Sequence, residues 1–131
     1  MHELVTENKL TVLIVEKKEA GSVLEKNISR LGHNVLIAEC YSDAMQKAVE
    51  DHCDLIVMDI DLPDWDGVKI ISRIKELVGE INIVTMTDNN NREREQSVRD
   101  QRILYYAVKP LEFSEIRSIL NHILYKTKAF K

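Results

Sequence analysis

The sequence has few of the features that mark disulfide-bonded, metal-binding, membrane-spanning or nucleic-acid-binding proteins. Its two cysteines, Cys40 and Cys53, form neither a CxxC motif nor a metal-ligand spacing, so we expect reduced, half-buried thiols. No apolar run approaches the about 20 residues that span a bilayer, which argues against membrane insertion. The formal net charge of −4 argues against direct nucleic-acid binding, which needs a basic patch.

The signals of two further protein classes are missing. The first residues, MHELVTENK, lack the basic-then-apolar layout of a secretory signal, so we expect a cytoplasmic protein. The first apolar run leads into Glu-Lys-Lys-Glu-Ala-Gly rather than a glycine-rich phosphate loop, which argues against a nucleotide-binding enzyme. The length of 131 residues, by contrast, indicates how the chain is organised, because it suits one domain. We expect a flexible leader at 1–8, the domain at 9–126, and a tail or linker start at 127–131.

Five short apolar runs alternate with five helical patterns along the chain. The predicted strands are residues 10–15, 35–38, 55–58, 81–86 and 103–108, and the predicted helices are 20–31, Ser42 or Asp43 to 49, 68–78, 91–101 and 114–126. This alternation predicts an α/β domain with a doubly wound, five-stranded parallel sheet. The strand order 2-1-3-4-5, as in a flavodoxin-like three-layer sandwich, places the carboxyl ends of the first, third, fourth and fifth strands at one edge.

The segment 91–101 has an unusual composition for a helix in such a fold. Val98 is its single apolar residue, so a helix there can bury almost nothing. Propensity alone does not sustain so short a helix in water. We therefore predict a helix that is short, mobile or docked mostly by its ends. Before the third predicted helix, Asp66 is a suitable N-cap.

Polar residues follow four of the predicted strands at their carboxyl ends. Glu16 and Lys17 follow the first strand, Asp59 the third, Thr87 the fourth and Lys109 the fifth. The strand order brings these ends together, so a carboxylate, a hydroxyl and an ammonium are expected in one shallow pocket. Such a set can attach and hold a phosphoryl group: Asp59 as nucleophile, Lys109 as a point cation and Thr87 as a hydrogen-bond donor.

From about Leu10 to Leu124 the chain resembles the receiver domains of response regulators in two-component signalling. The most specific part of the resemblance is Asp59-Ile-Asp-Leu-Pro63 with Gly67, then Thr87 at a strand end, then Tyr106-Ala-Val-Lys109-Pro110. The resemblance implies a phosphoacceptor domain rather than an enzyme. Its partners would be a sensor histidine kinase or phosphotransfer protein, and a downstream protein or further output domain. The output would act through the face of the fourth helix, fifth strand and fifth helix.

The resemblance also implies a role for each matched residue. Asp59 would be the phosphoacceptor, Lys109 its ion-pair partner and Thr87 the phosphoryl sensor, with Tyr106 swinging inward beside Thr87. A Mg²⁺ ion would be held by Glu16, Asp59 and the backbone carbonyl of Asp61.

One position departs from the family pattern of two adjacent acids after the first strand. Glu16 matches the first acid, but Lys17 stands at the second, and an ammonium repels a cation that needs oxygen ligands. In one interpretation Lys17 points aside, a weak Mg²⁺ still binds, and Asp61 or Asp88 restores the charge. In the other, Lys17 pairs with Asp59, and the chain is a pseudo-receiver that binds partners independently of phosphorylation.

The remaining candidates are read as surface residues. The four histidines lie on separate elements without a second ligand at metal spacing (His2, His33, His52 and His122). Trp65 is expected on the loop beside the pocket, facing either a partner or solvent.

Overall fold

The computed structural model describes residues 9–129, with side chains up to residue 126. Five strands alternate with five helices. The strands are β1 (Thr11–Val15), β2 (Asn34–Ala38), β3 (Leu55–Asp59), β4 (Asn82–Thr87) and β5 (Tyr105–Val108). The helices are α2 (Lys18–Arg30), α3 (Tyr41–Glu50), α4 (Gly67–Val78), α5 (Arg92–Arg99) and α6 (Phe113–Ala129). The expected leader at 1–8 lies outside the described residues. Because α6 runs to Ala129, the expected tail begins within a helix.

The strands form one parallel sheet in the order β2-β1-β3-β4-β5, which confirms the predicted fold class and topology. In this register Asp59 pairs with Met86, and Thr87 pairs with Val108. The carboxyl ends of β3, β4 and β5 therefore lie at one edge, and Lys109 follows directly.

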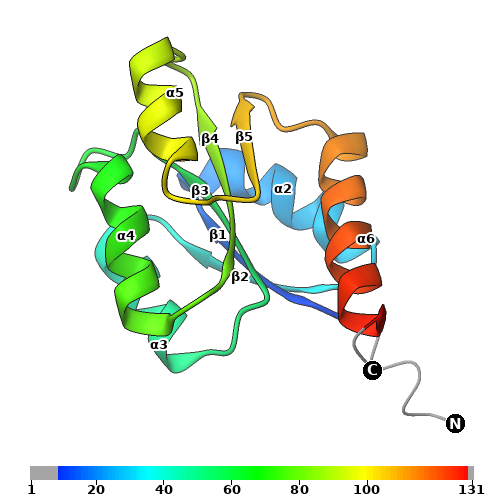
Figure 1. Ribbon diagram of the computed structural model, residues 1–131. Helices are drawn as coiled ribbons and strands as arrows, with labels where there is room; N and C mark the ends of the chain where they lie inside the picture. The colour runs from blue at the N-terminus through cyan, green and yellow to red at the C-terminus, as the bar shows by residue number, and fades with distance from the viewer. Residues whose placement is uncertain (1–8, 130–131) are drawn as a thin grey trace, which may run out of the picture.

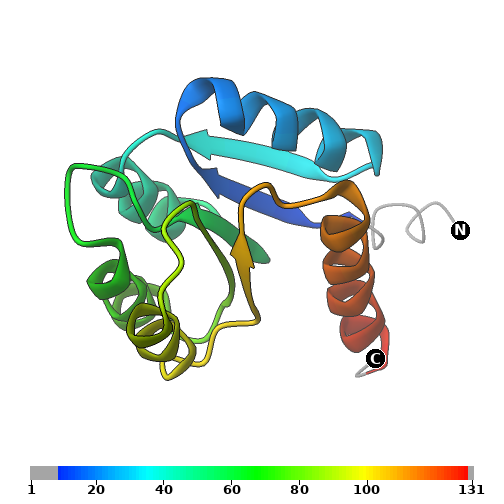
Figure 2. The same cartoon turned by 90° about the horizontal axis from the view of Figure 1, so that it is seen from above.

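Helices cover both faces of the sheet and bury its apolar strands. Figures 1 and 2 show α3, α4 and α5 on one face and α2 and α6 on the other. Alternate strand residues serve the two sides: Leu13 and Ile56 pack toward α3 and α4, whereas Ile14 and Val57 pack toward α2 and α6. Each such fully buried side chain contributes about 1.5–3 kcal/mol, so the sheet is a rigid platform for the residues at its edge.

Several predicted boundaries were wrong by a few residues. Helix α3 begins at Tyr41, so Ser42 and Asp43 lie inside its first turn, and Cys40 is the N-cap without a side-chain hydrogen bond. Strand β5 begins only at Tyr105, because Arg102 takes a left-handed backbone conformation (φ 61°) that turns the chain before the strand. The apolar pair Ile103-Leu104 extended the predicted strand beyond its true start, and the polar Ser42 and Asp43 suggested a cap later in the chain than Cys40.

The start of α4 fixes the loop that follows Asp59. Asp66 caps the helix as predicted, since its side chain accepts a hydrogen bond from Val68 N at 3.0 Å. Gly67 is required by close packing, because a Cβ there would collide with the carbonyl oxygen of Ile60 and the hydroxyl of Tyr41. The loop is thus held against the end of β3.

The histidines and cysteines show one correction. His33 is buried, and its Nδ1 accepts a hydrogen bond from Leu10 N at 3.0 Å, so the prediction of a surface position was wrong. His52 and His122 are exposed, and His2 lies outside the described residues. Both cysteines are free and half-buried, as expected, and burial raises the pKa of the Cys53 thiol to about 11. In the part of the chain that the structure describes, no helix is long and apolar enough to cross a membrane.

Candidate functional site

Lys109 joins the two carboxylates at the edge of the sheet. Its Nζ donates to Oδ2 of Asp59 at 2.8 Å and lies 2.7 Å from Oε2 of Glu16. Both acids are almost fully buried, with exposed fractions of 5% and 2%. Three side chains that the sequence placed at separate strand ends are therefore in direct contact. Buried carboxylates need such a partner, since an unpaired buried charge is costly.

The charges of this cluster are coupled through burial. Burial and the neighbouring Asp59 carboxylate raise the pKa of Glu16, although the hydrogen bond from Lys109 opposes them. Burial alone would lower the pKa of Lys109, but its hydrogen bonds to Asp59 and Glu16 outweigh that effect, so the pKa is raised. Lys109 is thus a permanent cation at neutral pH, in direct contact with both carboxylates.

Thr87 lies at the end of β4 as expected, but its hydroxyl is engaged by Asp61 rather than by Asp59. Thr87 Oγ1 donates to Oδ2 of Asp61 at 2.7 Å. It accepts hydrogen bonds from Asn89 N and from Nη1 of Arg94, both at 2.9 Å. Asp61 in turn is linked to Asp59, since its backbone N donates to Oδ1 of Asp59 at 2.7 Å.

The Asp61 carboxylate is held by three groups. Partial burial would raise its pKa, but hydrogen bonds from Thr87, from Asp88 N and from Arg94 outweigh burial, so the pKa lies below its usual value. Nη2 of Arg94 is 2.6 Å from Oδ1 of Asp61. The Asp61 side chain therefore remains ionised at neutral pH and is committed to these partners.

Arg94 of α5 was not predicted as a site residue. The sequence drew attention to its segment only through a lack of apolar residues, and Arg94 is one of several arginines there. The expected short helix is confirmed, since α5 has eight residues. It is held near its ends, by Arg94 at the first turn and by Gln101, whose Nε2 donates to Val68 O at 2.8 Å.

Tyr106 lies on β5 with its ring buried. Its hydroxyl donates to Oδ1 of Asn90 at 2.9 Å, and the guanidinium of Arg99 lies 5.5 Å from the ring centroid. The side chain therefore bridges β5, the loop after Thr87 and helix α5 in this conformation.

Tyr41 is a second residue that sequence reasoning missed. It is fully buried, and its hydroxyl donates to the backbone oxygen of Asp59 at 2.7 Å while accepting from Leu62 N at 3.1 Å. Burial raises the pKa of this phenol, so it stays protonated. In the sequence, Tyr41 resembles any aromatic residue that packs at the start of a helix. In the structure its hydroxyl bonds to Asp59 and Leu62, which flank Asp61 in the loop after β3.

Lys17 points away from the cluster, as the first interpretation expects. Its side chain is exposed, and its backbone N donates to Oε1 of Glu16 at 3.2 Å. Among residues 9–126, no hydrogen bond or ion pair joins Lys17 to Asp59. The pairing of the second interpretation is therefore wrong, because Lys109 holds that position.

The residues present do not fit a resident Mg²⁺ ion. Glu16 and Asp59 share the ammonium of Lys109, and the position of a further acid is taken by the exposed Lys17. The Asp61 carboxylate, as distinct from its backbone carbonyl, is committed to Arg94 and Thr87, and Asp88 is largely exposed, 3.8 Å from Lys109. Within the described part of the chain, no group of three or more acidic, histidine or cysteine side chains is arranged to hold a metal ion. Glu16, Asp59 and the backbone carbonyl of Asp61 supply only part of an octahedral oxygen set, and the Lys17 side chain adds no further oxygen ligand.

The comparison with protein families decides the class of this domain. The model of the family described as "Response regulator receiver domain" matches residues 12–121. The chain belongs to this family. Receiver domains are signalling domains of two-component systems, and phosphorylation of an aspartate is general among them.

Individual relatives agree with the family assignment. The chain is 27% identical over 115 residues to the DNA-binding transcriptional regulator NtrC of Azospirillum brasilense, covering 87% of this chain and 24% of NtrC. It is 32% identical over 120 residues to the autoinducer 1 sensor kinase/phosphatase LuxN of Vibrio campbellii, covering 91% of this chain and 14% of LuxN. The chain thus spans about a quarter or less of the length of these relatives.

Solved structures show the same receiver fold. The CheY-like response regulator receiver domain protein from Methanospirillum hungatei JF-1 superposes with a TM-score of 0.84 at 19% identity, covering 93% of this chain and 98% of that one. At this identity the likeness supports the fold alone.

Proposed function

We propose that this receiver domain accepts a phosphoryl group on Asp59 from a histidine kinase or phosphotransfer protein and passes the signal to a protein partner. The observation that carries the proposal is the contact of Lys109 with both Asp59 and Glu16 at the carboxyl edge of the sheet. A cation between two buried acids neutralises charge where a phosphoryl group would be added. We place this reaction in the cytoplasm, where sensor kinases present their phosphorylated histidines.

The chemistry follows from the contacts of Asp59. A carboxylate oxygen of Asp59 attacks phosphorus, the P–O bond forms and the P–N bond of the phosphohistidine breaks. The bonding electrons leave on the imidazole nitrogen, which then takes a proton. Lys109 offsets the added negative charge, and Thr87 can donate to a phosphoryl oxygen once its proton leaves Asp61.

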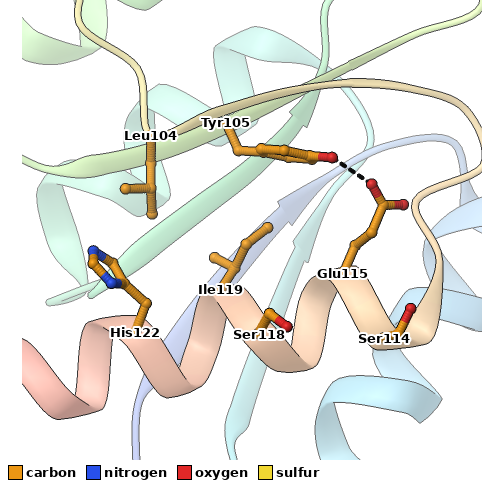
Figure 3. Close-up of a pocket in the computed structure, with 7 residues that line it drawn as sticks. All are labelled: Leu104, Tyr105, Ser114, Glu115, Ser118, Ile119 and His122. Atoms are coloured by element: carbon orange, nitrogen blue, oxygen red, sulfur yellow. Dashed lines mark hydrogen bonds between the residues drawn. The ribbon is translucent and has the colours of Figure 1, made fainter.

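The output surface that we propose is the face of α5, β5 and α6. Tyr106 connects this face to the loop after Thr87 through Asn90. Beside it, a groove between β5 and α6 is lined by Leu104, Tyr105, Ser114, Glu115, Ser118, Ile119 and His122. Figure 3 shows Tyr105 hydrogen-bonded to Glu115 across the mouth of this groove. A charge change at Asp59 that moves Tyr106 would alter this surface.

Incubation with phosphoramidate, a small phosphoryl donor, tests the acceptor. Intact-protein mass spectrometry should detect one added phosphoryl group, and the Asp59→Asn variant should gain none. Reactions are run with Mg²⁺ and with EDTA, and we expect uptake to survive chelation because the site does not fit the ion. Uptake only with Mg²⁺ would mean that Glu16, Asp59 and the Asp61 carbonyl hold it after all.

A second candidate function is a phosphorylation-independent interaction module. It is favoured by Lys17, which removes an acid that the family pattern has beside Glu16. Absence of phosphoryl uptake by folded protein, with and without Mg²⁺, would support this module and reject the phosphoacceptor. Partner binding that is equal for the wild type and Asp59→Asn would point the same way.

A further inference from the structure

We propose that Arg94 is a positioning residue that holds Thr87 in a resting conformation and couples helix α5 to the acceptor site. The inference rests on the proposed phosphoacceptor function of Asp59. We call the arrangement the Arg94 clamp: the guanidinium of Arg94 with its partners Asp61, Thr87 and the backbone oxygens of Ile60 and Asn89.

The clamp uses both terminal nitrogens of the guanidinium. Nη1 donates to Thr87 Oγ1 at 2.9 Å and to Asn89 O at 3.3 Å. Nη2 donates to Ile60 O at 2.8 Å and lies 2.6 Å from Oδ1 of Asp61. The planar fork of arginine suits this geometry, whereas a lysine ammonium could not reach the same four atoms in a fixed arrangement.

The clamp leaves the Thr87 hydroxyl without spare hydrogen-bonding capacity. A hydroxyl has one proton and two acceptor lone pairs. The hydroxyl donates its hydrogen bond to Asp61, and its lone pairs accept hydrogen bonds from Asn89 N and Arg94 Nη1. Thr87 can therefore donate to a phosphoryl oxygen on Asp59 only if the hydrogen bond to Asp61 breaks.

Breaking that bond affects α5 because the helix has few other attachments. Val98 is the only buried residue among its eight. When the hydroxyl of Thr87 turns away from Asp61, Asp61 loses a hydrogen-bond donor and Arg94 loses an acceptor held in a fixed position. Arg94 lies on the first turn of α5. Phosphorylation would thus loosen the amino-terminal end of α5, where Asp61 and the backbone oxygens of Ile60 and Asn89 remain as partners of Arg94, while Gln101 and Lys75 retain the segment that follows its carboxyl end.

The clamp lowers phosphoryl occupancy, so its removal should raise it. Arg94→Gln is compared with Arg92→Gln, which removes the same charge from an exposed position of the same helix. The loss of one charge-assisted hydrogen bond corresponds to about a tenfold shift in an equilibrium, so the half-saturating concentration of phosphoramidate should fall about tenfold in Arg94→Gln. Arg92→Gln should match the wild type, and Arg94→Lys should lie between the two.

Backbone amide hydrogen exchange in the unphosphorylated protein gives an independent readout. Arg94→Gln should speed exchange at Asp88 N, Asn89 N and the first turn of α5, whereas Arg92→Gln should not. This readout does not need phosphorylation. If the wild type gains no phosphoryl group, the proposed function fails, and the exchange data still test the clamp.

Two results would overturn the clamp. One is reduced phosphoryl uptake in Arg94→Gln, which would make Arg94 a phosphoryl ligand instead. The other is unchanged uptake together with unchanged exchange. If Arg94→Gln fails to fold, Asp61→Asn serves in its place, because it removes the charge that holds Arg94. Where all variants fold, Arg94→Gln and Asp61→Asn should be non-additive, since each breaks the same pair.

Discussion

The Lys109 ammonium lies 2.8 Å from Oδ2 of Asp59, although fifty residues separate the two in the chain. The parallel sheet creates this contact, because β3 and β5 both end at the edge where the polar residues follow. The pair also shares Glu16, so three charges form one nearly buried unit. Its net charge of −1 is what the phosphoryl group of the proposed reaction would meet.

Removal of the cation should be severely destabilising. Lys109→Met leaves Glu16 and Asp59 buried side by side without their partner, and we expect a loss on the order of 3 kcal/mol at pH 7. Urea unfolding measures it. The loss should shrink in acid, because Glu16, with its raised pKa, can then bind a proton. Adding Glu16→Gln should restore part of the stability; no recovery would argue against repulsion as the cause.

The buried phenol of Tyr41 should contribute through its two hydrogen bonds. Tyr41→Phe leaves the Asp59 carbonyl and the Leu62 amide unpaired, which should cost about 1–3 kcal/mol. Tyr125→Phe is the matched control, since Tyr125 is exposed and should show almost no change. Thermal unfolding of the two variants measures the difference. Equal melting temperatures would mean that the Tyr41 hydroxyl contributes nothing to the unfolding free energy.

Two glycines should respond to alanine in opposite directions. Gly67→Ala forces a Cβ against Ile60 and Tyr41, so it should lower stability by more than about 2 kcal/mol. Gly21 lies within α2, and a Cβ there would meet only ordinary van der Waals contacts with Glu16 and Ile37, so Gly21→Ala should stabilise by about 0.5–1 kcal/mol through helix propensity. Chemical denaturation measures the change in unfolding free energy for each variant. No change in Gly67→Ala would mean that the loop after Asp59 can move to accommodate the added Cβ.

Two threonines of β4 offer a further contrast. Thr85 Oγ1 is buried and has no hydrogen-bond partner within the described residues, so Thr85→Val should stabilise by about 1 kcal/mol. Thr87→Val removes a hydroxyl with three hydrogen bonds and should destabilise by about 1–2 kcal/mol. Parallel urea titrations test the pair. A loss of stability in Thr85→Val would indicate an unseen partner for its hydroxyl.

His33 should make stability depend on pH below neutrality. Burial lowers its pKa from 6.5, although Asp54 opposes the shift. Because the folded state prefers neutral imidazole, its contribution is complete above pH 6.5 and is lost as the pH falls toward the lowered value. In a His33→Gln variant this part of the pH dependence of the unfolding free energy should be absent, and the pH dependence due to other groups should remain. Unfolding free energies of the wild type and the variant are measured between pH 7 and pH 5. An equal decrease in both proteins would contradict this role of His33.

The sequence was sufficient to predict the sheet and the meeting of Asp59 with Lys109. Both follow from short apolar runs that end in polar residues, and the strand order then fixes which ends are neighbours. The sequence was also sufficient to single out Lys17 as a departure. It could not tell whether the lysine points inward, because that depends on competition with Lys109 for the same carboxylates.

Side-chain partners within the loops could not be predicted. The sequence predicts a metal-binding backbone carbonyl or a spare acid at Asp61, but nothing in it indicates that its carboxylate is held by Thr87 of β4 and Arg94 of α5. His33 was misplaced because a buried histidine with one backbone donor leaves no pattern in the chain. Such contacts depend on rotamers and on loop paths, for which apolar spacing carries no information.

The single buried valine of α5 has a consequence for the design of signalling proteins. Since the other side chains of this helix do not belong to the core, its outer surface can be exchanged for that of another receiver at little cost in folding. A graft that keeps Val98 and Arg94 would preserve the attachment of the helix while changing what it displays. If the proposed output surface is correct, recognition of a new partner can be introduced on this helix without redesigning the sheet.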